Sequence, residues 1–409
     1  MFATSMPTPV RLDRRALAVV LVFAAAQDAA FALIFLSSMN HYLLDVLKTS
    51  AGAPGFALAL YGGTKLVTHP LAGRLLDRTS PRLVFRLAVA VQVAAIVLHL
   101  AFRGLPMFLV MAMLMAAGSA AMWPLIYDAV SRTQPVAGHG RAAGILSLAG
   151  YLSTGVGLAV GVLLSGNLTP WRTAVVVAGL MVVLPLLLQG EPALERTGTA
   201  PHEQRQKPRR GSLDPGVALF AAVIFLDYAC IASIAGIYGP YVRLTLHITL
   251  LKTTLLLIPA GGAALLSLLV ASRISRPNRR FLEMAVLYVL ASIGAFALAS
   301  TTSPGLAAGF AVITALGLGG IAPIVAATML DLGGEEGRGL LIGSLMSVEG
   351  AGSIAGPGVV AVVADLSGPR AAFGVVGAGL AALVALTLFA SSLPRIRKAT
   401  GSEGNAPPE

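Results

Sequence analysis

The chain has 409 residues, of which 56% are hydrophobic and 11% are charged, and its mean hydropathy is +0.83. Soluble domains carry about 25% charged residues, so a water-soluble globular protein is excluded and lipid must cover the apolar surface. The net charge of +11 does not indicate nucleic-acid binding, because the basic residues sit in short clusters between apolar runs rather than along one face.

Apolar runs long enough to cross a bilayer follow one another along the chain. A spanning helix needs roughly 20 mainly apolar residues. The twelve expected spans are 16–38, 53–73, 83–102, 105–128, 142–165, 171–189, 215–238, 249–271, 281–300, 304–328, 339–364 and 370–392. They lack the alternation over about ten residues that is typical of a membrane β-barrel, so the sequence predicts an all-α membrane protein. The first run is too long for the apolar core of a signal peptide, and we expect it to be retained.

A polar stretch at residues 190–214 divides the expected spans six and six. It predicts a basic, flexible cytoplasmic linker between an N-terminal six-helix bundle at 1–189 and a C-terminal one at 215–393. Residues 394–409 are predicted to form a disordered cytoplasmic tail. An even span count puts both termini on one side, where 22 of the 29 Lys and Arg residues then lie. The positive-inside rule therefore predicts cytoplasmic termini, and we expect a plasma-membrane location.

Landmark residues recur along the chain with offsets of 197–199 positions, which predicts a duplicated six-helix unit. The pairs are Asp28 with Asp227, Pro124 with Pro323, Arg141 with Arg338, and Arg172 with Arg370. The two prolines fall within expected spans, where each permits either a local break that frees carbonyl groups or a simple kink.

The loop after the second expected span carries a recognisable motif. Its residues Gly73, Asp77, Arg78 and Arg82 follow the spacing G-x-x-x-D-R-x-G-R-[KR], with Ser80 and Pro81 at two signature positions. In the eleventh span the spacing G-x8-G-x3-G-P is formed by Gly343, Gly352, Gly356 and Pro357. On these motifs the chain resembles the major facilitator superfamily over nearly its whole length.

The resemblance implies two pseudo-symmetric six-helix bundles that give alternating access to a central site. It implies a cytoplasmic gate in which Asp77 approaches the N-terminus of the eleventh span, where the helix dipole favours an anion. Arg78 and Arg82 would then bind carbonyl groups, acids or lipid headgroups, unless their charge serves orientation alone. Two departures from the family pattern count against export. Leu114 stands where many proton-linked exporters have an arginine, and the glycine motif lies in the eleventh span of this chain, whereas exporters carry it in the fifth.

Four ionisable residues fall well inside expected spans: Asp28, Lys65, Asp227 and Glu349. A charge at mid-bilayer costs about 2.5–3.5 kcal/mol on insertion scales, so each of these residues is expected to have a structural or functional role. Asp28 and Asp227 lie at matching depths, where loss of water favours a neutral carboxyl and suits a proton carrier or a counter-ion for a cation. Helix–helix hydrogen bonding is the structural alternative. Lys65 is expected to pair with Glu349 between the bundles or with Asp28 within one, and the sequence leaves both open.

Further residues are candidates for the wall of a substrate site. Trp123, Tyr127 and Tyr151 combine apolar bodies with polar groups, although each also suits plain packing. Gln27, beside Asp28, and Gln92 are candidates for binding substrate, with contact to another helix as the alternative for one of them. The glycines of the eleventh span are expected to let helices approach closely.

Enzyme function is not indicated. His41 and Asp45, four apart, lack a companion nucleophile or ligand set, the single Cys230 excludes a cysteine-rich metal site, and the chain has no P-loop sequence. We expect no cofactor and no metal. The favoured function is proton-coupled export of a small amphipathic or cationic organic compound by a monomeric secondary transporter. The alternative is uptake or facilitated transport of a small polar or anionic solute, and a membrane receptor or embedded enzyme is more remote.

Overall fold

A computed structural model describes residues 14–133, 139–165, 176, 178–179, 215–248, 250–276, 279–332 and 338–392, and all regular structure within these ranges is helical. The helices of the N-terminal half are α1 (Arg14–Phe31), η1 (Ala32–Ser38), η2 (His41–Val46), α2 (Ala53–Arg78), α3 (Pro81–Ala101), α4 (Leu105–Thr133) and α5 (His139–Ser165). Those of the C-terminal half are α7 (Pro215–Pro240), η5 (Tyr241–Thr245), α8 (Leu250–Ile274), α9 (Arg280–Ser300), α10 (Pro304–Gly319), α11 (Ile321–Leu332), α12 (Arg338–Ser367) and α13 (Pro369–Ser392).

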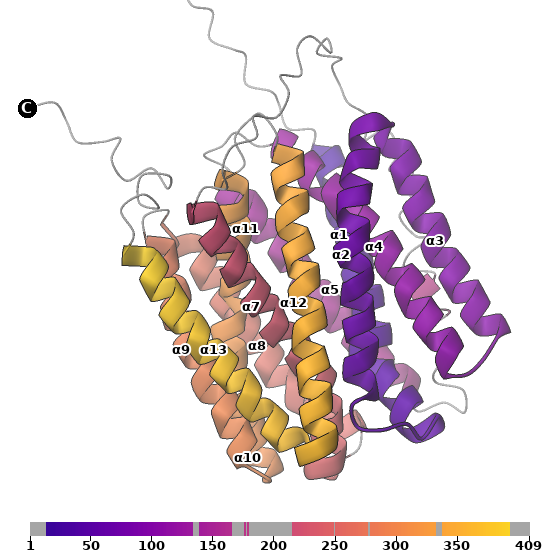
Figure 1. Ribbon diagram of the computed structural model, residues 1–409, viewed down its shortest axis with the longest axis vertical. Helices are drawn as coiled ribbons and strands as arrows, with labels where there is room; N and C mark the ends of the chain where they lie inside the picture. The colour runs from indigo at the N-terminus through magenta and orange to yellow at the C-terminus, as the bar shows by residue number, and fades with distance from the viewer. Residues whose placement is uncertain are drawn as a thin grey trace, which may run out of the picture.

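The helices run side by side as one bundle (Figure 1). We call the end where α13 stops the terminal end, and the end where α12 joins α13 the distal end. Ten helical segments of the described residues are long and apolar enough to cross a membrane. Helix α2 has 26 residues but is less apolar, because Lys65 and His69 interrupt it. The expected span at 171–189 lies mostly outside the described residues, so the count of twelve stays a prediction.

The first and seventh spans are longer than the sequence indicated. The first continues through two π-helical segments, Ala32–Ser38 and His41–Val46, and the seventh ends in a further one, Tyr241–Thr245. Polar residues such as His41 and Asp45 interrupt the apolar run, but they lie within the helix, where their side chains bond to each other at 2.8 Å. Both therefore belong to a helix rather than to a loop.

The tenth span is broken at Gly320, between α10 and α11. Pro323 explains the position, because its ring lacks an N–H and would collide with the carbonyl of Gly319, four residues earlier. Helix α4, in contrast, continues through Pro124 as one element. Of the two prolines, one accompanies a break and the other does not.

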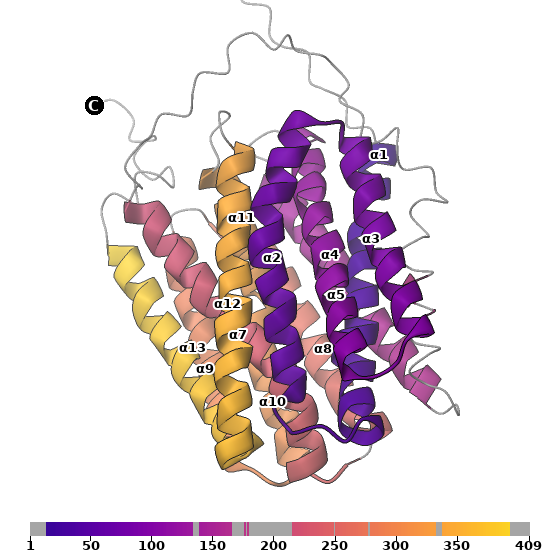
Figure 2. The same cartoon turned by 45° about the vertical axis from the view of Figure 1, so that its right-hand side comes forward.

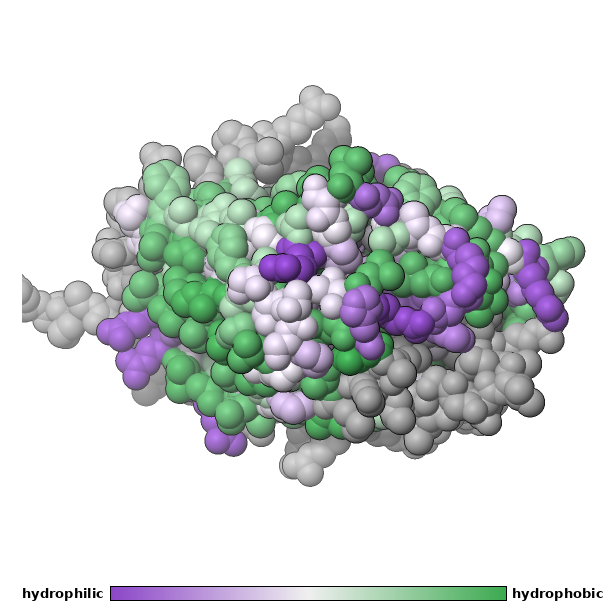
Figure 3. All heavy atoms as spheres, turned by 90° about the horizontal axis from the view of Figure 1, so that it is seen from below, coloured by the Kyte–Doolittle hydropathy of each residue, from purple (hydrophilic) through white to green (hydrophobic). Residues whose placement is uncertain are grey.

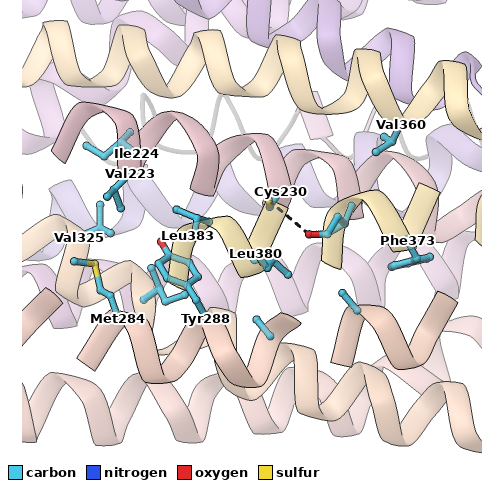
Figure 4. Close-up of a cluster of buried hydrophobic side chains, with 14 of the residues drawn as sticks. Val223, Ile224, Cys230, Met284, Tyr288, Val325, Val360, Phe373, Leu380 and Leu383 are labelled. Atoms are coloured by element: carbon cyan, nitrogen blue, oxygen red, sulfur yellow. Dashed lines mark hydrogen bonds between the residues drawn. The ribbon is translucent and has the colours of Figure 1, made fainter. Parts of the chain in front are cut away.

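Buried side chains form two hydrophobic clusters, one from residues 23–178 and one from residues 220–390. Figure 4 shows part of the second, including Tyr288 and Cys230, which is 4% exposed and behaves as a small apolar residue. Trp123 packs against both clusters. Each half of the chain thus has its own core, and the two cores meet at this indole.

Helix α12 lies between α2 of the N-terminal half and α7 of its own half (Figure 2). Glycines permit these approaches: an added Cβ at Gly352 would collide with the carbonyl of Phe225, and one at Gly356 with that of Ala229. Pro357 is buried in the same stretch of α12. The surroundings of Gly343 lie outside the described residues. Helix α12 therefore joins the two halves, and it packs against the backbone of α7 in its own half.

Candidate functional site

Four ionisable side chains from four helices interact between the two halves. Lys65 of α2 interacts electrostatically with Glu349 of α12 and with Asp28 of α1. Asp227 of α7 also interacts with Glu349. We call Asp28, Lys65, Asp227 and Glu349 the charge cluster. Both carboxyl groups that the sequence offered as partners thus act on Lys65, and which of them forms an ion pair with it stays a prediction.

Tyrosine side chains surround the charge cluster. The ammonium of Lys65 lies 5.2 Å from the ring centroid of Tyr61, and the phenol of Tyr228 hydrogen-bonds with Glu349. Tyr151 of α5 interacts with both aspartates, one from each half. Tyr288 of α9 lies against Asp227. The cluster thus holds three carboxyl groups and one ammonium, with phenols among them that can donate to a carboxylate or accept from a proton donor.

The two aspartates have different surroundings. A Cβ at Gly150 would lie 2.6 Å from the Oδ2 of Asp28, so the glycine makes room for that carboxyl group on α5. Asp227 is 3% exposed, and its Oδ1 has no hydrogen-bond partner among the described residues. An unsatisfied buried carboxylate oxygen is costly, so Asp227 is suited to a hydrogen-bond donor in addition to the Tyr288 phenol that lies against it.

The remaining candidate wall residues lie in different settings. Gln27 is 5% exposed, and its Nε2 has no hydrogen-bond partner in the part of the chain that the structure describes. Trp123 packs between the two cores, while the side chain of Tyr127 lies outside the described residues. Gln92 is fully buried on α3 and faces Gly118 of α4. Gln92 is therefore a packing residue within the N-terminal half.

The expected gate residues lie where α2 ends and α3 begins. No atom of the described residues lies within 4 Å of a Cβ added at Gly73 on α2, and the side chains of Asp77 and Arg78 in its last turn lie outside the described residues. Arg82 lies in the first turn of α3. The departures from the family motif have a local cause: the Ser80 hydroxyl accepts from the Leu83 N–H at 3.3 Å as a helix cap, and a proline follows at the first helical position.

His69 is a residue near the charge cluster that sequence reasoning passed over. It is 1% exposed and lies one helical turn from Lys65, on the terminal side. Its ring is held beside Ala120 of α4. The spacing of four residues from Lys65 was the available signal.

The halves also touch at the distal end through charged groups. Arg243 of η5 forms an ion pair with Asp45 of η2, and Asp45 accepts a hydrogen bond from His41 at 2.8 Å. We call His41, Asp45 and Arg243 the distal clamp. Nearby, the Gly52 N–H donates to Asp365 at 2.7 Å. Seen from this end, hydrophilic side chains are scattered over a mostly hydrophobic face (Figure 3).

A cavity of about 280 Å³ lies between the halves, next to the distal clamp. We call it the distal cavity. Segments from both halves line it: the run from η1 through η2, and α5, α7, η5, α8, α9 and α10, with leucine, isoleucine and alanine side chains predominating. Its polar lining residues are Ser37, Asn40, His41, Tyr238, Arg243 and Thr314. The charge cluster does not line it.

Comparisons with known proteins identify the family. The profile of the Major Facilitator Superfamily matches residues 17–336. No curated protein sequence matches the chain. Among solved structures, the crystal structure of the human organic anion transporter MFSD10 (TETRAN) has a TM-score of 0.74 and 16% identity, covering 93% of this chain and 100% of that one. That identity supports a shared fold alone. The chain belongs to the Major Facilitator Superfamily, whose members are membrane transporters rather than enzymes.

Proposed function

We propose that the protein is a secondary active transporter that exports a small amphipathic or cationic organic compound in exchange for protons. The observation that carries the proposal is the charge cluster, in which carboxyl groups from both halves interact with one lysine. Charges inside a membrane protein are costly and mark ion or substrate paths.

Contacts between the halves at both ends of the bundle support alternating access. At the distal end, Arg243 reaches Asp45. Towards the terminal end, α5 approaches α8 so closely that a Cβ at Gly144 would lie 3.1 Å from the Cβ of Ser272. A rocking transporter opens one such contact at a time while the other stays closed.

In this proposal, Lys65 couples proton binding to movement of the two halves. When Asp28 carries a proton, Glu349 remains the charged partner of Lys65, and this attraction joins the two halves. When Asp28 loses its proton, it draws Lys65 towards its own half and weakens that link. The two predicted ion pairs are then two states of one switch, in which losing a partner is costly and exchanging one is cheap.

The remaining features of the proposal concern the membrane. We place both termini in the cytoplasm on the distribution of Lys and Arg, with twelve spans, the sixth at 171–189, and the plasma membrane as the location. Export then carries the compound from the terminal end to the distal end. We take the functional unit to be a monomer.

The proposal is tested in proteoliposomes with an imposed pH gradient. A mixed set of amphipathic amines, alcohols and carboxylates is loaded inside, and mass spectrometry measures which compounds leave. We expect Asp28→Asn and Asp227→Asn to reduce gradient-driven export to the level of empty liposomes. Glu283→Gln is the matched control, because Glu283 accepts from the Arg276 backbone outside the cluster. Unchanged export in both aspartate variants would overturn the proton-carrier role.

A further inference from the structure

The distal cavity has the size and lining of a site for a small organic molecule. Its volume is about 280 Å³, near the lower end of the range for ligand pockets. Side chains from both halves supply an apolar wall, among them Leu36 and Leu158 on one side and Ile231, Ile234 and Leu257 on the other. A molecule seated there would contact both halves at once.

Two buried polar groups in the wall have no hydrogen-bond partner in the described part of the chain. Ser37 is 3% exposed and Asn40 is 5% exposed, and both line the cavity. The Oγ of Ser37 and the Oδ1 of Asn40 have no hydrogen-bond partner among the described residues. Leaving such groups unsatisfied costs about 1–3 kcal/mol each. A ligand that donates a hydrogen bond to Asn40 and bonds with Ser37 would remove that cost.

Asn40 is held at the cavity by its neighbour on α7. An added Cβ at Gly239, itself a lining residue, would collide with the side-chain amide of Asn40. The glycine therefore leaves the amide room where the two halves meet. Substitution at Gly239 would displace the hydrogen-bonding group rather than simply fill space.

The charges around the cavity disfavour an ionic ligand. No aspartate or glutamate is among the described residues that line it, so a cation would find no carboxylate. Arg243 does line it, but its charge is paired with Asp45, so an anion would have to displace that partner. Asp227 lies four residues before Ile231 on α7, about 6 Å along the helix. Asp227 thus lies about one helical turn from the lining, and the carboxylate of Asp45 is occupied by Arg243 and His41.

We propose that the distal cavity binds an uncharged amphipathic molecule whose hydroxyl or amide headgroup bonds with Ser37 and Asn40 while its apolar body packs against both halves. This inference rests on the transport function proposed above and narrows its substrate to uncharged compounds. It separates the solute site from the proton site in the charge cluster.

Binding is tested with probes that share an octyl chain and differ in headgroup: 1,2-octanediol, octylammonium and octanoate. The purified full-length protein in lipid nanodiscs is unfolded by heat with each probe at equal concentration. A ligand that binds the folded state raises the midpoint. We expect the diol to give the largest rise, and Asn40→Ala and Ser37→Ala each to remove at least half of it. Ser300→Ala, whose hydroxyl bonds to Ala297 at the distal end, is the matched control and keeps the full rise.

Two further variants keep the test decisive. Ala315→Leu adds volume inside the cavity and should abolish the rise, whereas a retained rise would show that the diol acts from the lipid and would overturn the site. Asn40→Ser replaces Asn40→Ala if the latter unfolds without ligand. A larger rise with octylammonium or octanoate would overturn the uncharged class. Because the assay uses no gradient, failure of proton-driven export with diol binding intact would overturn the transport proposal alone.

Discussion

The two halves carry equivalent residues that have kept their chemistry in the middle of the bundle and changed it at the distal end. Asp28 and Asp227, 199 positions apart, are both acidic and both belong to the charge cluster. Asp45 and Arg243, 198 apart, have opposite charges and pair with each other. Where equivalent residues face each other across the interface, identical charges would repel. Divergence of the repeat therefore replaces a repulsion at the distal end with an attraction.

The same contrast applies to uncharged pairs. Asn40 and Gly239 are 199 positions apart and touch, and contact is possible because one of them has no side chain. Gly157 and Gly356, also 199 apart, have instead stayed the same: an added Cβ on either would collide with a carbonyl, of Ala29 on α1 or Ala229 on α7. In these pairs the contact within a half is repeated, whereas equivalent positions that touch each other across the halves carry different residues.

The largest expected effect tests the repeated contact within each half. Gly157→Leu and Gly356→Leu should each destabilise the protein by at least about 1–3 kcal/mol, because a backbone carbonyl cannot move aside as a flexible side chain does. Thermal unfolding in nanodiscs measures the loss. The control is Gly155→Leu, where a Cβ meets nothing within 4 Å. If only one of the two substitutions lowered the stability of the protein, the two contacts would not be equivalent.

The second prediction compares an interaction between halves with one inside a half. Lys65→Met combined with Glu349→Gln, and Lys65→Met combined with Asp28→Asn, form two double-mutant cycles on unfolding free energy. We expect coupling energies within about 0.5–3 kcal/mol for both, because Glu349 and Asp28 both interact with Lys65. Lys65→Met with Asp365→Asn should be additive, because Asp365 lies at the distal end. Additivity in both test cycles would remove Lys65 from the proposed switch.

The third prediction concerns the two prolines. Pro124→Ala and Pro323→Ala each supply an N–H, so each should raise stability by about 0.5–1.5 kcal/mol. Transport should fall with Pro323→Ala, because α10 and α11 would become one continuous helix and could no longer move separately. Transport should persist with Pro124→Ala, because α4 is already one continuous helix. Gradient-driven export beside thermal unfolding separates the two effects. Equal transport in both variants would make the break at Gly320 incidental.

The sequence was sufficient for the all-helical membrane fold, the family and the identity of the four charged residues, because hydropathy and the cost of a buried charge are local properties. It could not choose the partner of Lys65, since that depends on how α1, α2 and α12 pack. Tyr288 was beyond its reach for the same reason: no periodicity connects α9 to Asp227 on α7. Errors within a single helix were smaller: the sequence predicted the first span but placed its end too early, before His41.

The smallest expected effect lies at the distal clamp. The side chains of Arg243 and Asp45 are 30% and 24% exposed, and solvent-accessible ion pairs contribute about 0.2–1 kcal/mol. Asp45→Arg or Arg243→Asp would place like charges together and shift the distal end towards opening by about fivefold at most. Combining the two substitutions restores opposite charges and should restore closure. The interaction should also weaken with added salt, because the pair is within reach of counter-ions.

Distance between labels at the distal end reports this shift. Val46 and Leu244, 54% and 51% exposed on opposite halves, accept cysteine-linked fluorophores in a Cys230→Ala background. Energy transfer should fall in each single variant and recover in the combined one, although incompletely, because the exchange removes the bond from His41 to Asp45. His41→Ala measures that missing part. Should the combined variant match the single ones at every salt concentration, charge would not be what closes this end, and the divergence of the repeat would need another reason.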